Sequence, residues 1–151
     1  MAQGVILEAP PGHVEQWQSE AADDEGTFNF SLRLLNMEHA EGEWLPSAHV
    51  GVSDRSGGKQ FQVVLVHSKK GKGIMLGYKY VVAGSVLVNK AVLHGVPLNE
   101  ILRVTFKVSA NGQVSVQTVG LNQSFETGIS KPYGIFGVSG ARAEFFPAEN
   151  G

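Results

Sequence analysis

Three polar residues, Arg33, His49 and Gln62, alternate with apolar neighbours in segments that have the pattern of strands. Saccharides are bound by planar hydrogen-bonding side chains of this kind, together with an aromatic ring that covers the apolar face of the sugar. If the three segments are neighbouring strands, the three side chains line one groove. A solvated sheet face is the alternative interpretation, because polar residues opposite an apolar stripe are ordinary on strands.

Two aromatic residues, Trp44 and Tyr78, complete the predicted ligand-binding set. Trp44 follows a loop rich in Glu and Gly, where it would either stack on a sugar at the mouth of the groove or cover the core beneath the loop. Tyr78 and Tyr80 share one face of their segment, so they would form a stacking platform or pack in the core with their hydroxyls at the rim. Trp17 is a weaker candidate of the same type.

Catalytic and metal-binding patterns are weak in this sequence. Retaining glycoside hydrolysis needs two carboxyl groups about 5 Å apart, and no predicted strand carries two acids on one face. The enzymatic alternative would need an acid pair from two different segments, Glu43 and Asp54. Because no strand supplies such a pair, the sequence favours a non-catalytic protein. No two histidines have the spacing of a zinc site. The run 23–25 of Asp-Asp-Glu would offer oxygen ligands to calcium, but such a run is usually a solvated loop, so we expect no cofactor.

Length and composition limit the classes of protein that remain. The 151 residues predict one domain spanning residues 1–151. The formal net charge of −2 gives no electrostatic basis for binding nucleic acid or an anionic membrane, and cysteine is absent. The first residues lack the basic start and apolar run of a signal peptide. We therefore expect either a cytoplasmic protein or the mature form of an exported one.

The elements that must position these side chains are strands. Residues 27–37, 47–53, 60–67 and 74–82 alternate or bear β-branched runs, and short strands are also expected near 4–8, 85–94, 101–108 and 113–119 and on both sides of Ser139-Gly140. Asn111-Gly112 predicts a hairpin with a type I′ turn. Residues 13–26 are expected to form a loop or one helical turn. About ten strands and no helical period predict an all-β fold of two packed antiparallel sheets, with a closed barrel as the main rival.

The order of these segments resembles the concanavalin A-like lectin and glucanase superfamily, which includes laminin G-like domains. The resemblance covers roughly Phe28 to Phe146 and rests on segments 28–34, 49–53, 61–65 and 102–108, the Asn111-Gly112 turn, and segments 114–116, 134–138 and 143–146. It implies a jelly-roll sandwich with a concave and a convex sheet, and a role connected with carbohydrate. The acid motif of the glucanases, the metal loop of legume lectins and the side-chain set of galectins are not recognisable, so any ligand contacts are this chain's own.

These observations leave three functions open. The first is a lectin-like domain that binds a glycan or small saccharide on the concave sheet without catalysis, and we favour it. The second is a structural or protein-interaction module that forms a homo-oligomer, and the third is a glycoside-processing enzyme. Aromatic residues on the polar face would indicate a saccharide, whereas a continuous apolar patch there, built from Leu35, Met37, Val64 and Val66, would indicate a protein partner.

Overall fold

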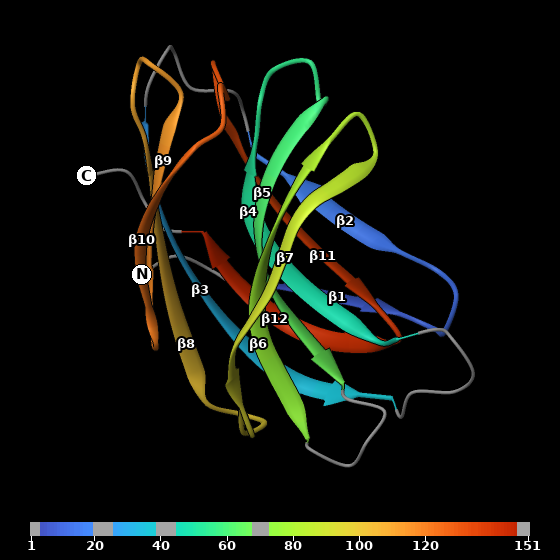
Figure 1. The fold of residues 1–151 in the computed structure, drawn as a ribbon. Helices are drawn as coiled ribbons and strands as arrows, with labels where there is room; N and C mark the ends of the chain where they lie inside the picture. Colours follow the sequence, from blue (N-terminus) through green and yellow to red (C-terminus); the bar gives the residue numbers. More distant parts are fainter. Residues whose placement is uncertain (1–3, 20–25, 39–44, 68–72, 148–151) are drawn as a thin grey trace.

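The computed structural model describes residues 4–19, 26–38, 45–67 and 73–147, which form strands and turns (Figure 1). The strands are β1 (Val5–Ala9), β2 (Glu15–Gln18), β3 (Gly26–Met37), β4 (Ser47–Ser53), β5 (Lys59–His67), β6 (Ile74–Val82), β7 (Ser85–His94), β8 (Ile101–Val108), β9 (Gln113–Thr118), β10 (Leu121–Glu126), β11 (Tyr133–Ser139) and β12 (Ala141–Pro147). None of these residues forms an apolar helix of membrane-spanning length.

Two six-stranded antiparallel sheets lie face to face in Figure 1. The first sheet has the order β1-β12-β3-β8-β9-β10, and the second has the order β2-β11-β4-β5-β6-β7. Neighbours along the chain pair as hairpins from β4 to β7 and from β8 to β10, whereas β3 pairs with β12 and β4 with β11 across long stretches of sequence. This combination of local hairpins and returning strands makes two separate sheets, so the predicted sandwich is confirmed over the closed barrel.

The alternation predicted for the early strands is what fills the core. Phe28, Phe30, Leu32 and Leu34 of β3 point inward and are buried, and Ala48, Val50 and Val52 do the same on β4. Since successive side chains of a strand point to opposite faces, the intervening residues of β3 and β4 must point outward. The outward position of His49 follows from this pattern.

Aromatic rings join the two sheets. Phe136 of the second sheet stacks on Phe145 of the first, with ring centroids 4.7 Å apart, and on Trp17 at 4.6 Å, while Phe30 meets its edge at 4.9 Å. These rings form one buried column, and offset or edge contacts of this kind stabilise beyond the area they bury. Trp17 is partly buried and packs against the hydrophobic core through this column.

The column explains one error of the sequence interpretation. Residues 13–26 were expected to contain a loop or a helical turn, but residues 15–18 form β2, whose sequence is Glu-Gln-Trp-Gln. This polar strand is held by pairing with β11 and by the stacking of Trp17 on Phe136. Both contacts join residues that are far apart in the sequence, so local alternation does not predict them. The polar stretch after Leu121 likewise contains β10, which is anchored by Phe125 against Phe61 at 4.7 Å.

The predicted hairpin at Asn111-Gly112 is confirmed, but its predicted turn type is wrong. A type I′ turn needs positive φ at both central residues, and here only Gly112 has it, with φ of 84°. The amide of Gly112 donates to the carbonyl of Ser109 (3.0 Å), and the amide of Ser109 donates to the carbonyl of Gln113 (2.9 Å). Asn111 instead accepts side-chain hydrogen bonds, including one from the amide of Gln113 at 3.2 Å. This is the longer loop in which a glycine follows an ordinary turn and forms a bulge.

Candidate functional site

Polar side chains gather on the outward side of the second sheet, in the middle of its strands. His49 on β4 is paired with Gly137 on β11 and Val64 on β5, while Gln62 on β5 is paired with Gly51 on β4 and Lys79 on β6. His49 and Gln62 are therefore diagonal neighbours on adjacent strands, within reach of one ligand. We call this surface the β4–β5–β6 face, and it comprises His49, Gly51, Gln60, Gln62, Val64, Gly77 and Lys79.

Two glycines provide the space in which these polar side chains lie. A Cβ atom at Gly137 would come within 2.3 Å of Cε1 of His49, so the imidazole lies directly over that position. A Cβ atom at Gly51 would come within 2.3 Å of the carbonyl oxygen of Phe61 and 3.1 Å of Cγ of Gln62. The imidazole of His49 can therefore keep its place only while residue 137 has no side chain, whereas a side chain at residue 51 would conflict chiefly with the backbone of β5.

Each of the two side chains presents a polar atom that is shielded from solvent and has no hydrogen-bond partner among the described residues. These atoms are Nε2 of His49 and Oε1 of Gln62. The amide nitrogen of Gln62 is occupied, because it donates to Oε1 of Gln60 at 2.8 Å. An unsatisfied buried polar group costs about 1–3 kcal/mol. The face therefore holds one acceptor and one imidazole nitrogen that a ligand hydroxyl would satisfy.

The imidazole of His49 is neutral at physiological pH. Burial, which disfavours the charged form, and to a smaller extent the positive charge of Lys79 together lower the pKa of His49 from 6.5 to about 4. A neutral imidazole carries one donor and one acceptor nitrogen. His49 is thus equipped to hydrogen-bond with a hydroxyl group, and it adds no charge to the face.

The structure brings two of the five predicted ligand residues together and separates the others. Arg33 points outward from the first sheet, on the other side of the sandwich, where it pairs with Glu144. Tyr78 points into the core and is 5% exposed, with its ring stacked on Phe61. The expectation that these residues share a groove with His49 is therefore not met. Trp44 lies outside the described residues.

Two neighbouring polar residues were missed by the sequence interpretation. Gln60 lies one strand period before Gln62, and Lys79 lies between the inward-pointing Tyr78 and Tyr80. The alternation of residues 74–82 contained the signal for Lys79, because any residue between two core tyrosines must face outward. Tyr78 lies in the core and Tyr80 packs against it, which is the second of the two arrangements predicted for this pair.

The surface expected to be apolar is also differently arranged. Val64 and Val66 do belong to the outward side of the second sheet, where Val64 is 7% exposed. Met37, in contrast, packs in the core, and Leu35 belongs to the first sheet. The four residues do not form one patch, because they are divided between two sheets and the core.

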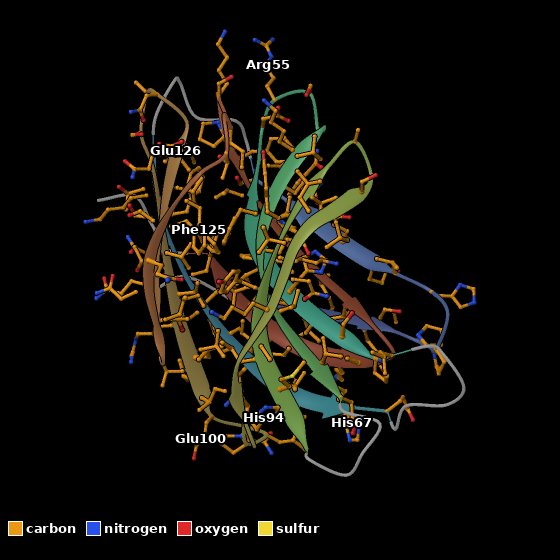
Figure 2. All side chains as sticks on the ribbon, viewed as in Figure 1. Arg55, His67, His94, Glu100, Phe125 and Glu126 are labelled. Atoms are coloured by element: carbon orange, nitrogen blue, oxygen red, sulfur yellow. The ribbon has the colours of Figure 1, made fainter. Side chains whose placement is uncertain are left out.

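Metal and acid clusters are not found in the part of the chain that the structure describes. No group of three His, Asp or Glu side chains there is placed to hold a metal ion. Figure 2 shows His67, His94 and Glu100 at one end of the sandwich and Arg55 and Glu126 at the other. The proposed calcium run at 23–25 and the acid Glu43 lie outside the described residues.

Solved structures with the same arrangement of sheets include saccharide-binding proteins. A carbohydrate-binding module (CBM66) from Bacillus subtilis matches with a TM-score of 0.61 at 9% identity, over 97% of this chain and 89% of that one. A toad ovary galectin in complex with thio-digalactose matches with a TM-score of 0.57 at 7% identity, over 90% of this chain and 95% of that one. The fold is the concanavalin A-like jelly roll.

An enzyme shares this concanavalin A-like fold as well. An alginate lyase from Pseudomonas aeruginosa matches with a TM-score of 0.58 at 13% identity, over 83% of this chain and 65% of the lyase chain, so this chain spans less than two thirds of that enzyme. No protein-family model and no curated protein sequence matches the chain. Since every one of these identities is low, the matches establish the fold, and the function must be argued from the residues of this chain.

The concanavalin A-like sandwich has a second notable surface at its β7 edge. Three consecutive residues of this edge strand are exposed apolar side chains: Val86 (53%), Leu87 (61%) and Val88 (41%). A hollow of about 370 Å³ continues from the end of β7 towards the first sheet and is lined by Leu93, Val96, Ile101 and Val119, among others. An edge strand with exposed apolar residues and free backbone groups is a template for pairing with another chain.

Proposed function

We propose that this protein, acting as a single domain of residues 1–151, binds a glycan on the β4–β5–β6 face without catalysing a reaction. The observation that carries the proposal is the pair of shielded, unpartnered atoms on that face, Nε2 of His49 and Oε1 of Gln62. Buried polar groups in proteins are normally hydrogen-bonded. A saccharide, whose hydroxyl groups both donate and accept, can satisfy both atoms at once.

The surrounding positions suit a flat polar ligand. Gly77 follows in the same outward row as His49 and Val64, and this row is bounded there by the carbonyl oxygen of Lys90 on β7, which lies 2.5 Å from where a Cβ atom of residue 77 would stand. Val64 is only 7% exposed and adds little surface of its own, while Gln60 and Lys79 are partly exposed and add hydrogen-bond donors beside Gln62. Among the described residues, Tyr133 is the aromatic side chain on this side of the sheet, at the end of β11. Binding by this face depends more on hydrogen bonds than on stacking.

A glycoside-processing activity has less support on this face. The second acid suggested by the sequence, Asp54, is engaged in the β4–β5 turn, where its Oδ1 accepts hydrogen bonds from Ser56 Oγ (3.0 Å) and the amide of Lys59 (3.1 Å). The structural neighbours include carbohydrate-binding modules and galectins that are named for saccharide recognition. Together these points favour binding over hydrolysis.

The test is a glycan-array screen of the purified protein, with and without calcium, followed by calorimetry on the glycans that bind. We expect saturable binding that is lost in His49→Ala and in Gln62→Ala. Arg33→Ala is the control on the other sheet, because it removes a polar side chain from the outward face of the first sheet and leaves the β4–β5–β6 face intact. Binding that is lost equally in all three variants, or a blank array, would contradict the proposal.

A second candidate function, an interaction module that forms a homo-oligomer, is favoured by the exposed apolar residues of β7. Pairing of two copies along this edge would cover Val86, Leu87 and Val88 and satisfy free backbone groups. Sedimentation of the wild-type protein beside Leu87→Lys tests it. A dimer that dissociates in the variant would support the module, and a wild-type monomer at high concentration would exclude it.

A further inference from the structure

The outward surface formed by β2, β11, β4, β5 and β6 of the second sheet carries positive charge and no negative charge. Along β2, β11, β4, β5 and β6, every outward-pointing position is glycine, apolar, hydroxyl or amide-bearing, apart from His49 and Lys79. None of these positions is Asp or Glu, although the whole chain has 14 acids against 12 Lys and Arg. Because His49 is neutral, Lys79 alone gives this surface a formal charge.

Lys79 also lacks a carboxylate partner within the described residues. The ion pairs found there, Arg33 with Glu144 and Arg142 with Glu8, both belong to the first sheet. Lys79 is only partly exposed and is flanked across the sheet by Gln62 and Asn89, which are uncharged. A partly shielded ammonium group attracts an anion more strongly than one in open water, because the surrounding medium screens it less.

The position of Lys79 relative to the unpartnered atoms indicates which kind of ligand would fit. Gln62 is its direct neighbour across β5 and β6, and His49 lies one row away on β4, near enough for the ammonium charge to act on its imidazole. The acceptor Oε1 of Gln62 requires a donor from the ligand, which a hydroxyl supplies and an anionic group does not. A ligand that carries an anionic group next to a hydroxyl would satisfy Lys79 and Gln62 together.

We propose that the saccharide bound on the β4–β5–β6 face is acidic, and that its carboxylate or sulfate group pairs with Lys79 while a neighbouring hydroxyl donates to Gln62. This inference rests on the proposed glycan-binding function and adds the chemical class of the ligand. A uronic acid and a sulfated sugar both supply an anionic group beside hydroxyls. Hydrogen bonds to charged groups are stronger than those between neutral groups, so the anion should dominate selectivity.

The experiment compares acidic oligosaccharides with neutral partners of the same backbone. The probes are oligogalacturonate with its methyl ester, and a sulfated galactan with its desulfated form, each measured by calorimetry at pH 7. We expect at least one acidic probe to bind about tenfold or more tightly than its neutral partner, as one hydrogen bond to a charged group would provide. Whether the galacturonate or the sulfated pair shows this preference identifies the anionic group.

Variants then assign the preference to Lys79. Lys79→Gln should reduce the acidic-to-neutral ratio to about one, and Lys79→Arg should retain it. Lys107→Gln is the control, because it removes the same charge from the outward side of β8 in the first sheet. Circular dichroism and thermal unfolding of each variant show that the fold is retained, and the arginine variant keeps the test decisive if the glutamine variant is unstable.

The outcomes separate this inference from the function on which it rests. Neutral and acidic glycans that bind equally, with binding lost in His49→Ala, would overturn the acidic preference and leave the glycan-binding face in place. An acidic preference that survives Lys79→Gln would overturn the role of Lys79. Absence of binding to every probe and to the glycan array would overturn both proposals.

Discussion

The imidazole of His49 lies over the α-carbon of Gly137, its cross-strand neighbour on β11, so closely that a methyl group there would come within 2.3 Å of the ring. The ring belongs to a largely buried side chain, so it has little freedom to move aside. The position of the candidate ligand group is therefore set by a residue that has no side chain of its own.

The first prediction concerns this contact. Gly137→Ala should destabilise the protein by about 1–3 kcal/mol, because the added methyl group overpacks the imidazole, and it should also abolish glycan binding by displacing Nε2. Chemical denaturation measures the first effect and calorimetry the second. The double variant Gly137→Ala/His49→Ala should recover stability relative to Gly137→Ala alone. Two effects that simply add would show that the residues do not conflict.

The second prediction concerns pH. His49 has a pKa of about 4 in the folded protein, compared with 6.5 for an ordinary histidine in the unfolded chain, so between these values the unfolded state binds a proton that the folded state does not. Stability from this group is fully present above pH 6.5 and is lost as the pH falls towards 4. The shift corresponds to roughly 3 kcal/mol.

Denaturation of wild-type protein and of His49→Gln at several pH values between 4 and 7 checks this prediction. Carboxylates titrate in the same range in both proteins, so the difference between the two curves isolates His49. We expect the free energy of unfolding to fall more steeply with acid in the wild type than in the variant. Parallel curves would mean that His49 titrates normally and is not buried as the structure places it.

Features that depend on residues close together in the sequence were predicted correctly, whereas features that depend on pairing between distant strands were not. The outward position of His49 and Gln62 was predictable, because it depends on alternation within one strand. The assignment of Arg33 to the opposite sheet was not, since it depends on the pairing of β3 with β8 and β12. Local periodicity predicts which face of a strand a residue occupies, but it does not predict which sheet that strand joins.

On β6, the prediction of ligand residues from side-chain chemistry disagreed with the faces that alternation assigns to them. An aromatic ring stacks well on a sugar, which makes Tyr78 a predicted ligand residue, yet Tyr78 shares the face of Leu76 and packs on Phe61 in the core, as the alternative interpretation of this residue expected. Lys79, on the β4–β5–β6 face, was not among the predicted residues. The strand β2 was missed for a different reason, since its polar sequence is held in place by Trp17 stacking on Phe136.

The third prediction tests that aromatic column. Phe136 is fully buried and contacts Trp17, Phe30 and Phe145, so Phe136→Ala should cost about 3–5 kcal/mol through lost burial and the cavity left behind. Phe136→Leu, which fills most of the volume, should cost clearly less. Thermal or chemical unfolding of both variants measures this order. Equal losses would indicate that the ring contacts, and not the volume, hold the sheets together.

The fourth prediction separates backbone strain from steric conflict at two glycines with the same backbone conformation. Gly112 has φ of 84° and Gly12 has φ of 80°, so alanine is strained at both positions. A Cβ atom at Gly112 would also lie 2.5 Å from the α-carbon of Gly128, whereas one at Gly12 would meet nothing within 4 Å. Gly112→Ala should therefore destabilise the protein more than Gly12→Ala, by at least about 1 kcal/mol.

The excess cost at Gly112 has an identifiable source in the hydrogen bonds that hold two loops together. Its carbonyl accepts hydrogen bonds from the amides of Thr127 and Gly128, both at 3.1 Å, and from Thr127 Oγ1 at 2.8 Å. A side chain at position 112 must push the two backbones apart and lengthen these bonds. Hydrogen exchange should therefore show faster exchange at the amides of Thr127 and Gly128 in Gly112→Ala, with unchanged rates there in Gly12→Ala. Equal destabilisation in the two variants, without faster exchange, would mean that backbone strain alone accounts for the cost and that the contact with Gly128 is relieved without loss.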